Sequence, residues 1–115
     1  MTDQPKTRYS VRGTVVAGDG SRAPFFLSLS EPFPDERFDW QCEVICRSFA
    51  QSPMHIYGDE PDFAWDLALS FVHLMLGLKE LTVVDSDGEV IRFPKPNLAR
   101  WGLEHKADAY YLQNQ

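Results

Sequence analysis

Cysteine is scarce in this chain, which carries only Cys42 and Cys46 among its 115 residues. On a strand, residues four apart share a face but stand ~13 Å from each other, which is beyond the reach of a disulfide. No second cysteine pair completes a zinc site, and the C-x-x-x-C spacing differs from the redox C-x-x-C motif. We therefore expect two buried core thiols, because free cysteine is among the most buried residue types.

Positive charge is also in short supply. The chain has 11 lysines and arginines against 17 aspartates and glutamates, so its formal net charge is −6. Such a chain repels a phosphate backbone, because lysine and arginine supply most of the affinity for nucleic acid. Electrostatic fields of opposite sign on two proteins speed their encounter and suppress binding to wrong partners. We therefore expect a basic protein partner and no nucleic acid.

The first ten residues, MTDQPKTRYS, lack the basic start and apolar run of a secretory signal, and Asp3 and Pro5 argue against a transit peptide. The most apolar stretch, residues 63–78, is shorter than the ~20 residues that span a bilayer. It also contains Asp66 and His73. These features predict a cytoplasmic location and no membrane contact.

Neither disorder nor repeats are indicated by the composition, which is 43% hydrophobic and 24% charged. A chain of this length is sufficient for one core, so residues 1–115 are predicted to form a single α+β domain. We expect residues 1–7 to be flexible and residues 108–115 to be frayed.

Alternation of polar and apolar residues predicts strands over four segments, which are residues 8–16, 23–30, 39–49 and 54–58. Their short connections favour an antiparallel meander. Residues 81–93 are predicted to form a C-terminal hairpin around the Asp87-Gly88 turn. The two prolines of EPFPDERF, residues 31–38, predict an exposed loop, because proline cannot donate to a strand ladder.

One long helix is predicted over residues 61–77, in the middle of the fold. Asp59 is suited to cap it, Pro61 fits its first turn, and Asp62 complements the helix dipole. Winding at ~100° per residue gathers a narrow polar stripe that we expect to face water, formed by Asp62, Asp66, Ser70, His73 and Gly77. The remaining surface is apolar, and the side chains predicted to be central to the core are Trp65, Leu69, Val72 and Met75.

The apolar arc of this helix is wider than one sheet face requires, because an ordinary amphipathic helix presents a stripe of little more than ~100°. Its flanks need cover, and three candidates are open. One is the loop around Phe33 and Phe38, and another is a second copy of the chain in a homodimer. The third is the C-terminal segment around Leu98, Trp101 and Tyr110. In this segment Asn97 is suited to cap a short helix that includes Leu98, Trp101, His105 and Leu112.

Motifs for catalysis or metal binding are weak. Asp62 and Asp66 lie one helical turn apart, a spacing at which two carboxylates can hold a divalent cation or act as an acid–base pair. A solvated stripe explains them without a ligand, and His73 lies ~10 Å from Asp66 along the helix axis, too far to share a metal. We therefore expect no enzyme activity, no metal and no cofactor. The alternative is a small enzyme, or a metal-binding or small-molecule-binding protein, that uses this acidic helix start.

The remaining candidate is a binding surface. EPFPDERFDW places aromatic side chains among carboxylates, and aromatic anchors among acidic groups suit a basic partner. The alternative is that both phenylalanines fold back over the helix flank. The predicted partner-binding residues, including two from the helix start, are Phe33, Asp35, Glu36, Phe38, Asp62 and Asp66.

Two stretches, DWQCEVIC and IYGDEPDFAWDLALSF, resemble an uncharacterised family of small bacterial α+β domains. In that family a Trp-x-Cys strand leads through a Gly-x-Asp turn into a helix rich in alanine and leucine. The resemblance covers residues 38–78 and is carried by Trp40, Cys42, Gly58, Trp65, Leu67 and Leu69. The run GDEPD, which starts at Gly58, departs from the Gly-x-Asp spacing.

Members of such families resemble the immunity proteins that accompany bacterial polymorphic toxins. The resemblance therefore implies a non-catalytic protein-binding module that inhibits a toxin. The residues that carry it are packing and turn residues, so it implies no active-site residue.

Overall fold

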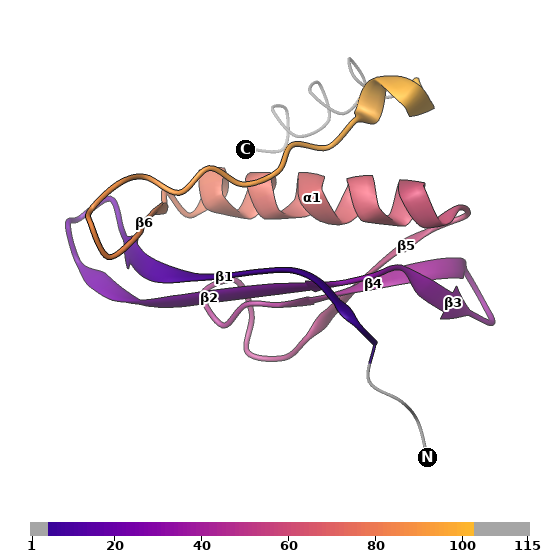
Figure 1. Cartoon of the computed structure of the whole chain (residues 1–115), viewed down its shortest axis with the longest axis horizontal. Helices are drawn as coiled ribbons and strands as arrows, with labels where there is room; N and C mark the ends of the chain where they lie inside the picture. Colours follow the sequence, from indigo (N-terminus) through magenta and orange to yellow (C-terminus); the bar gives the residue numbers. More distant parts are fainter. Residues whose placement is uncertain (1–4, 103–115) are drawn as a thin grey trace.

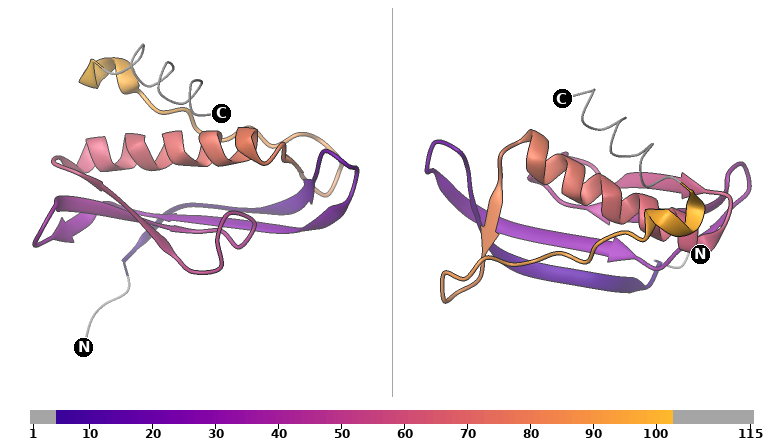
Figure 2. Two further views of the ribbon diagram at one scale, coloured as in Figure 1. Left: turned by 180° about the vertical axis from the view of Figure 1, so that it is seen from behind. Right: turned by 90° about the horizontal axis from the view of Figure 1, so that it is seen from above.

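The computed structural model describes residues 5–102, which form an α+β fold with one antiparallel six-stranded sheet and one α-helix (Figure 1). Its elements are, in chain order, β1 (Thr7–Val16), β2 (Arg22–Ser30), β3 (Phe33–Asp35), β4 (Asp39–Ile45), β5 (Met54–Gly58), α1 (Pro61–Leu78), β6 (Thr82–Val84) and the 3₁₀ turn η1 (Leu98–Trp101). The helix lies across one face of the sheet, as the view from behind in Figure 2 also shows.

Strands β1, β2, β4 and β5 pair in that order, each antiparallel to the next, as their short connections predict. β6 joins the other edge of β1, where it lies opposite residues 14–16. β3 pairs with the start of β4, where Phe33 lies opposite Gln41. β4 therefore has β5 along one side, and β2 and β3 in succession along the other.

The segment EPFPDERF is not the exposed loop that its prolines predict, because Phe33–Asp35 forms the short strand β3. Pro34 fits there, since an edge strand leaves one side of its backbone without a ladder partner. Asp35 closes the turn into β4, and its Oδ2 accepts hydrogen bonds from the N–H groups of Arg37 (3.0 Å) and Phe38 (2.9 Å). The prediction of an exposed loop was wrong because it rested on the two prolines and left out the side chain of Asp35, which forms the turn.

The predicted C-terminal hairpin is present in reduced form. Its turn is tight, with the Oδ1 of Asp85 accepting from the N–H of Asp87 at 2.8 Å, and Gly88 takes a positive φ of 83°. Only Thr82–Val84 forms a strand, and the returning chain makes an isolated bridge at Val90. After this bridge the chain leaves the sheet and runs along α1, so the second strand of the hairpin does not extend (Figure 1).

The core lies between α1 and the sheet. Leu69 and Val72 are buried as predicted, with exposed fractions of 3% and 1%, whereas Trp65 and Met75 are only partly buried at the edge of the core. The ring of Trp65 is covered by the guanidinium of Arg8, whose carbon lies 4.1 Å from the ring centroid. Within residues 5–102, no helix is both long and apolar enough to cross a membrane.

The start of α1 approaches β5 closely. A Cβ atom on Gly58 would come 2.7 Å from the backbone nitrogen of Ala64, so only glycine fits at the end of β5. Pro61 occupies the first turn of the helix, as predicted. The N-cap residue is Glu60, without a side-chain hydrogen bond, so the prediction that Asp59 caps the helix is wrong.

The middle of the polar stripe of α1 does not face water, because residues 94–101, here called the strap, run along the helix (Figure 1). Asp66 and Ser70 are buried, whereas Asp62 and Gly77 at the two ends of the stripe are exposed. Asp66 is only 2% exposed. Its carboxylate accepts hydrogen bonds from the backbone N–H of Asn97 (3.0 Å) and the indole N–H of Trp101 (2.8 Å). Arg100 adds an ion pair, with its Nε 3.1 Å from Oδ2. The expectation that Asp66 is solvent-exposed is therefore wrong.

The strap contacts α1 at two further points. The Nε2 of His73 lies 2.8 Å from the carbonyl oxygen of Pro94, so Nε2 carries the proton, because a carbonyl oxygen only accepts. The rings of Trp101 and Phe63 pack with their centroids 5.0 Å apart. Of the three covers predicted for the helix flanks, the C-terminal segment is the one that the structure shows on α1.

The predicted C-terminal helix begins where expected but is short within the described residues. It is the single 3₁₀ turn Leu98–Trp101, which follows Asn97. Its predicted continuation through His105 and Leu112, and the predicted fraying of residues 108–115, lie outside the described residues. At the other end of the chain, Thr7 already belongs to β1.

Asp66→Asn is expected to destabilise the protein. An amide has one oxygen where the carboxylate has two, so its NH₂ group would face either the Asn97 N–H or the Trp101 indole N–H, and both of these are donors. A buried donor left without a partner costs about 1–3 kcal/mol. Denaturant unfolding measures the loss, and tryptophan fluorescence reports the release of Trp101.

The matched control is Asp62→Asn. The side chain of Asp62 is 65% exposed and lies 3.7 Å from Arg100, so its loss is expected to leave stability nearly unchanged. Equal stability of the two variants would contradict the anchoring role of Asp66.

Both cysteines are buried and neither forms a disulfide, as predicted. Burial raises the pKa of the Cys42 thiol to about 12, although the charge of Arg8 opposes this, and burial also raises the pKa of Cys46. An unfolded thiol ionises near its ordinary value of 9.0. The stabilising effect of keeping Cys42 neutral is therefore complete below pH 9 and is lost as the pH rises toward about 12.

We expect both thiols to resist an aromatic disulfide reagent at pH 8 in the folded protein, because the thiolate is the reacting species. In denaturant both should react fully, and Cys46→Ala separates the two signals. Fast modification of Cys42 without denaturant would contradict its burial.

Candidate protein-binding surface

The face of the sheet that points away from α1, here called the outer face, carries alternate residues of each strand. Cys42 is fully buried in the core beneath α1, so its neighbours Gln41 and Glu43 point to the outer face. β5 places Tyr57 opposite Gln41 and His55 opposite Glu43. Paired residues on neighbouring strands share a face, so these four side chains lie together.

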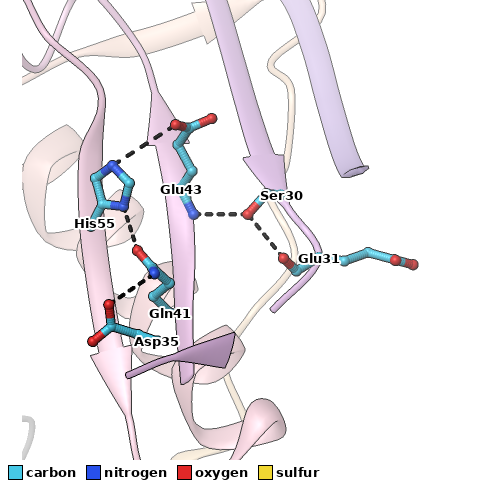
Figure 3. Close-up of polar contacts among 6 residues, drawn as sticks. All are labelled: Ser30, Glu31, Asp35, Gln41, Glu43 and His55. Carbon is cyan, nitrogen blue, oxygen red and sulfur yellow. Dashed lines mark hydrogen bonds and ion pairs between the residues drawn. The ribbon is translucent and has the colours of Figure 1, made fainter. Parts of the chain in front are cut away.

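A chain of polar contacts crosses strands β3, β4 and β5 on this face (Figure 3). The Nε2 of Gln41 donates to the Oδ1 of Asp35 at 3.2 Å, and its Oε1 lies 2.6 Å from the Nδ1 of His55. An amide oxygen only accepts, so Nδ1 carries the proton. The other ring nitrogen, Nε2, lies 3.8 Å from a carboxylate oxygen of Glu43, with which a protonated ring forms an ion pair.

A second group of contacts holds β4 where its partner changes from β2 to β3 (Figure 3). The backbone N–H of Glu43 donates to the hydroxyl of Ser30 at 2.8 Å, and this hydroxyl donates to the carbonyl oxygen of Glu31 at 3.0 Å. Ser30 is only 4% exposed. The hydroxyl of Ser30 thereby satisfies the backbone N–H of Glu43, which would otherwise lack a partner in the ladder at this junction. The start of β4 therefore keeps a defined position.

Aromatic rings surround this polar network. The ring of Phe33 packs edge-on against His55, with centroids 6.5 Å apart, and Phe38 packs against Tyr57 at 4.6 Å. The guanidinium of Arg37 lies over Phe38 at 5.2 Å. Phe38 nevertheless remains 48% exposed. Both phenylalanines therefore pack on β5 side chains of the outer face, whereas the alternative prediction placed them over the helix flank.

The structure divides the six predicted partner-binding residues between two parts of the molecule. Phe33, Asp35 and Phe38 come together at the β3–β4 turn, and Glu36 is exposed in that turn. We define the outer-face patch as these four residues together with the partly or fully exposed outer-face residues beside them on β4 and β5, which gives Phe33, Asp35, Glu36, Phe38, Glu43, His55 and Tyr57. Asp62 and Asp66 lie apart from it on α1, where Asp66 is buried under the strap.

Glu43, His55 and Tyr57 were not among the predicted site residues. Their alternation was visible in the sequence, since Glu43 is two residues from Gln41 on the predicted strand over residues 39–49. What the sequence does not contain is the register of β5 against β4, which sets His55 opposite Glu43. A shift of one residue would have sent the same side chains toward α1.

The acidic start of α1 is engaged within the chain. Asp62 and Asp66 share Arg100, at 3.7 Å and 3.1 Å, so a cation already lies between the two carboxylates. Among residues 5–102, no group of three or more histidine, cysteine, aspartate or glutamate side chains is placed to hold a metal ion. What the outer-face patch offers is contact chemistry, with carboxylates for cations and exposed rings for apolar contacts.

Comparisons of the chain with family models, with curated proteins and with solved structures found no match. The resemblance of residues 38–78 to small bacterial α+β domains, and through them to immunity proteins, stays a prediction.

Proposed function

We propose that this protein is a non-catalytic binding module that holds a basic protein against its outer-face patch, as an immunity-type inhibitor holds a bacterial toxin. The single observation that carries the proposal is the combination of exposed rings and carboxylates on strands that are fixed by hydrogen bonds. Phe38 supplies the most exposed ring. Asp35 and Glu43 supply carboxylates at the two ends of the polar network.

Preorganisation supports binding at this surface. Asp35 accepts hydrogen bonds from two backbone N–H groups of its own turn, and its second oxygen meets Gln41. Side chains that are already held in place lose little further freedom when a partner arrives, so more of the contact energy remains as affinity. The turn that carries Phe38 is therefore suited to act as an anchor.

Charge supports a basic partner. The patch contains the carboxylates of Asp35, Glu36 and Glu43, and the whole chain carries a formal charge of −6. Opposite charge raises the association rate, whereas buried aromatic contacts at the centre of an interface mainly slow dissociation. A toxin with a basic surface around its active site would be covered by such a patch, and its substrate would be excluded.

The first experiment is genetic. If the proposal is right, genes next to this one encode a toxin domain, and that toxin kills cells unless this protein is expressed with it. A neighbourhood of metabolic genes only, together with no protein that binds the purified chain, would contradict the proposal.

Substitutions in the patch then separate its two contributions. Glu36→Lys is expected to slow association with the toxin several-fold at low salt, because Glu36 is exposed and a reversed charge repels a basic surface. Phe38→Ala is expected to speed dissociation by about tenfold or more, as loss of an aromatic anchor does. Surface plasmon resonance at two salt concentrations measures both rates.

The matched control is Glu89→Lys, which makes the same change of charge in the exposed turn after β6. It should leave association nearly unchanged. An equal effect of Glu36→Lys and Glu89→Lys would show that only the total charge matters, which would remove the patch from the interface.

A further inference from the structure

A pocket of about 340 Å³ opens at the opposite end of β4 from the outer-face patch. Its walls come from β1, β2, the end of β4 and the loop that follows, and they are formed by Arg12, Pro24, Phe25, Phe26, Ile45, Arg47 and Ser48. This loop extends from the sheet on the side away from α1 (Figure 1). The pocket therefore has strands for a floor and a loop for one wall.

Two arginines line this pocket, and one of them stacks on an aromatic ring. Arg12 lies directly opposite Phe26 in the β1–β2 ladder, and its guanidinium carbon is 4.5 Å from the centroid of the Phe26 ring. In the β2–β4 ladder Ser28 is opposite Ile45, where β4 ends, and Arg47 lies in the turn that follows and lines the same pocket as Phe26. Stacking on Phe26 restricts the guanidinium of Arg12 and leaves its N–H edges available.

Neither arginine has a carboxylate partner in the described part of the chain. The ion pairs there join His55 to Glu43, and Arg100 to Asp62 and Asp66. The pocket lining itself contains no aspartate or glutamate. In a chain with 17 acidic and 11 basic residues, two permanently charged guanidiniums therefore line one pocket with no counter-charge among residues 5–102.

We propose that this pocket binds a small organic anion, consisting of an apolar ring or short chain that bears a carboxylate or a phosphate. Arg12 and Arg47 hold the anionic group, because a guanidinium fork matches the oxygens of carboxylates and phosphates. Phe26, Pro24 and Ile45 contact the apolar body, and the Ser48 hydroxyl is a further hydrogen-bonding group in the lining.

The volume of the pocket and the net negative charge of the protein restrict the ligand further. Ligand pockets run from about 300 to 1,000 Å³, so this one is at the small end and suits a molecule of roughly one substituted ring. A polyanion is excluded, because the surrounding chain is acidic and repels phosphates that extend beyond the pocket. The inference does not depend on the protein partner proposed above, since the two sites use different residues and opposite charges.

The test is a nuclear magnetic resonance titration of the ¹⁵N-labelled protein with phenyl phosphate, benzoate and inorganic phosphate, at constant pH and ionic strength. Phenyl phosphate and benzoate should shift the amide signals of Phe26, Ile45 and Ser48 with saturation. Inorganic phosphate should bind more weakly than phenyl phosphate, because it has no apolar body. The double variant Arg12→Gln/Arg47→Gln should raise the Kd for phenyl phosphate by at least about tenfold.

The control is Lys79→Gln/Arg92→Gln, which removes two exposed cations outside the pocket and should leave the Kd unchanged. All four of these side chains belong to exposed residues, so both variants should fold, and an unchanged thermal midpoint verifies this. Absence of saturable shifts, or an equal loss of binding in the control variant, would overturn the proposal. Equal affinity for inorganic phosphate and phenyl phosphate would overturn the role of the apolar wall.

The other candidate to fill this pocket is a second copy of the chain, and light scattering tests whether the protein is a dimer. If the wild-type protein is a dimer and Arg12→Gln/Arg47→Gln makes it a monomer, carboxylates of the second copy fill the pocket and the small-anion proposal is wrong. An unchanged mass supports it.

Discussion

One helix covers one face of the sheet, and this constraint shapes everything else in the molecule. Because side chains alternate along a strand, every strand that buries a residue beneath α1 presents the next one on the outer face. The buried Cys42 between Gln41 and Glu43 is an example. The outer face must therefore tolerate water, and the polar, charged and aromatic groups that satisfy this need also make the outer-face patch and the arginine pocket.

The apolar surface of α1 must instead be covered from water, and the contacts of a buried charge help to hold part of that cover in place. Transfer of a carboxylate from water into a core is costly unless donors compensate it. Asp66 receives two hydrogen bonds and an ion pair, all from the strap. The contacts that compensate the buried charge of Asp66 therefore also hold the strap on the helix. This explains why the chain leaves the sheet so soon after β6.

Local patterns were sufficient to predict the main elements. Alternation identified β1, β2, β4 and β5, and the proline in the first turn placed the start of α1 at Pro61. The local patterns did not predict the contacts between residues that lie far apart in the sequence. A helical wheel shows that Asp66 is polar, but not that Asn97 and Trp101, more than thirty residues away, come to meet it. The aromatic and acidic residues of the β3–β4 turn were found from sequence, whereas Glu43 and His55 joined them only through strand register.

The outer face combines two regions of opposite charge along β4, and their separation decides whether they influence each other. Glu43 and Arg47 are four steps apart in the chain, which at ~3.3 Å per residue gives ~13 Å. At physiological ionic strength the screening length is about 8 Å. An anion bound in the pocket as proposed, which neutralises Arg12 and Arg47, would therefore change the field at the patch only slightly, so the two proposed sites are expected to act independently. In low salt the coupling grows, and the basic end would then repel the proposed basic partner, which the acidic end would attract. For that proposed partner, the asymmetry would favour one orientation and would keep the pocket outside the interface.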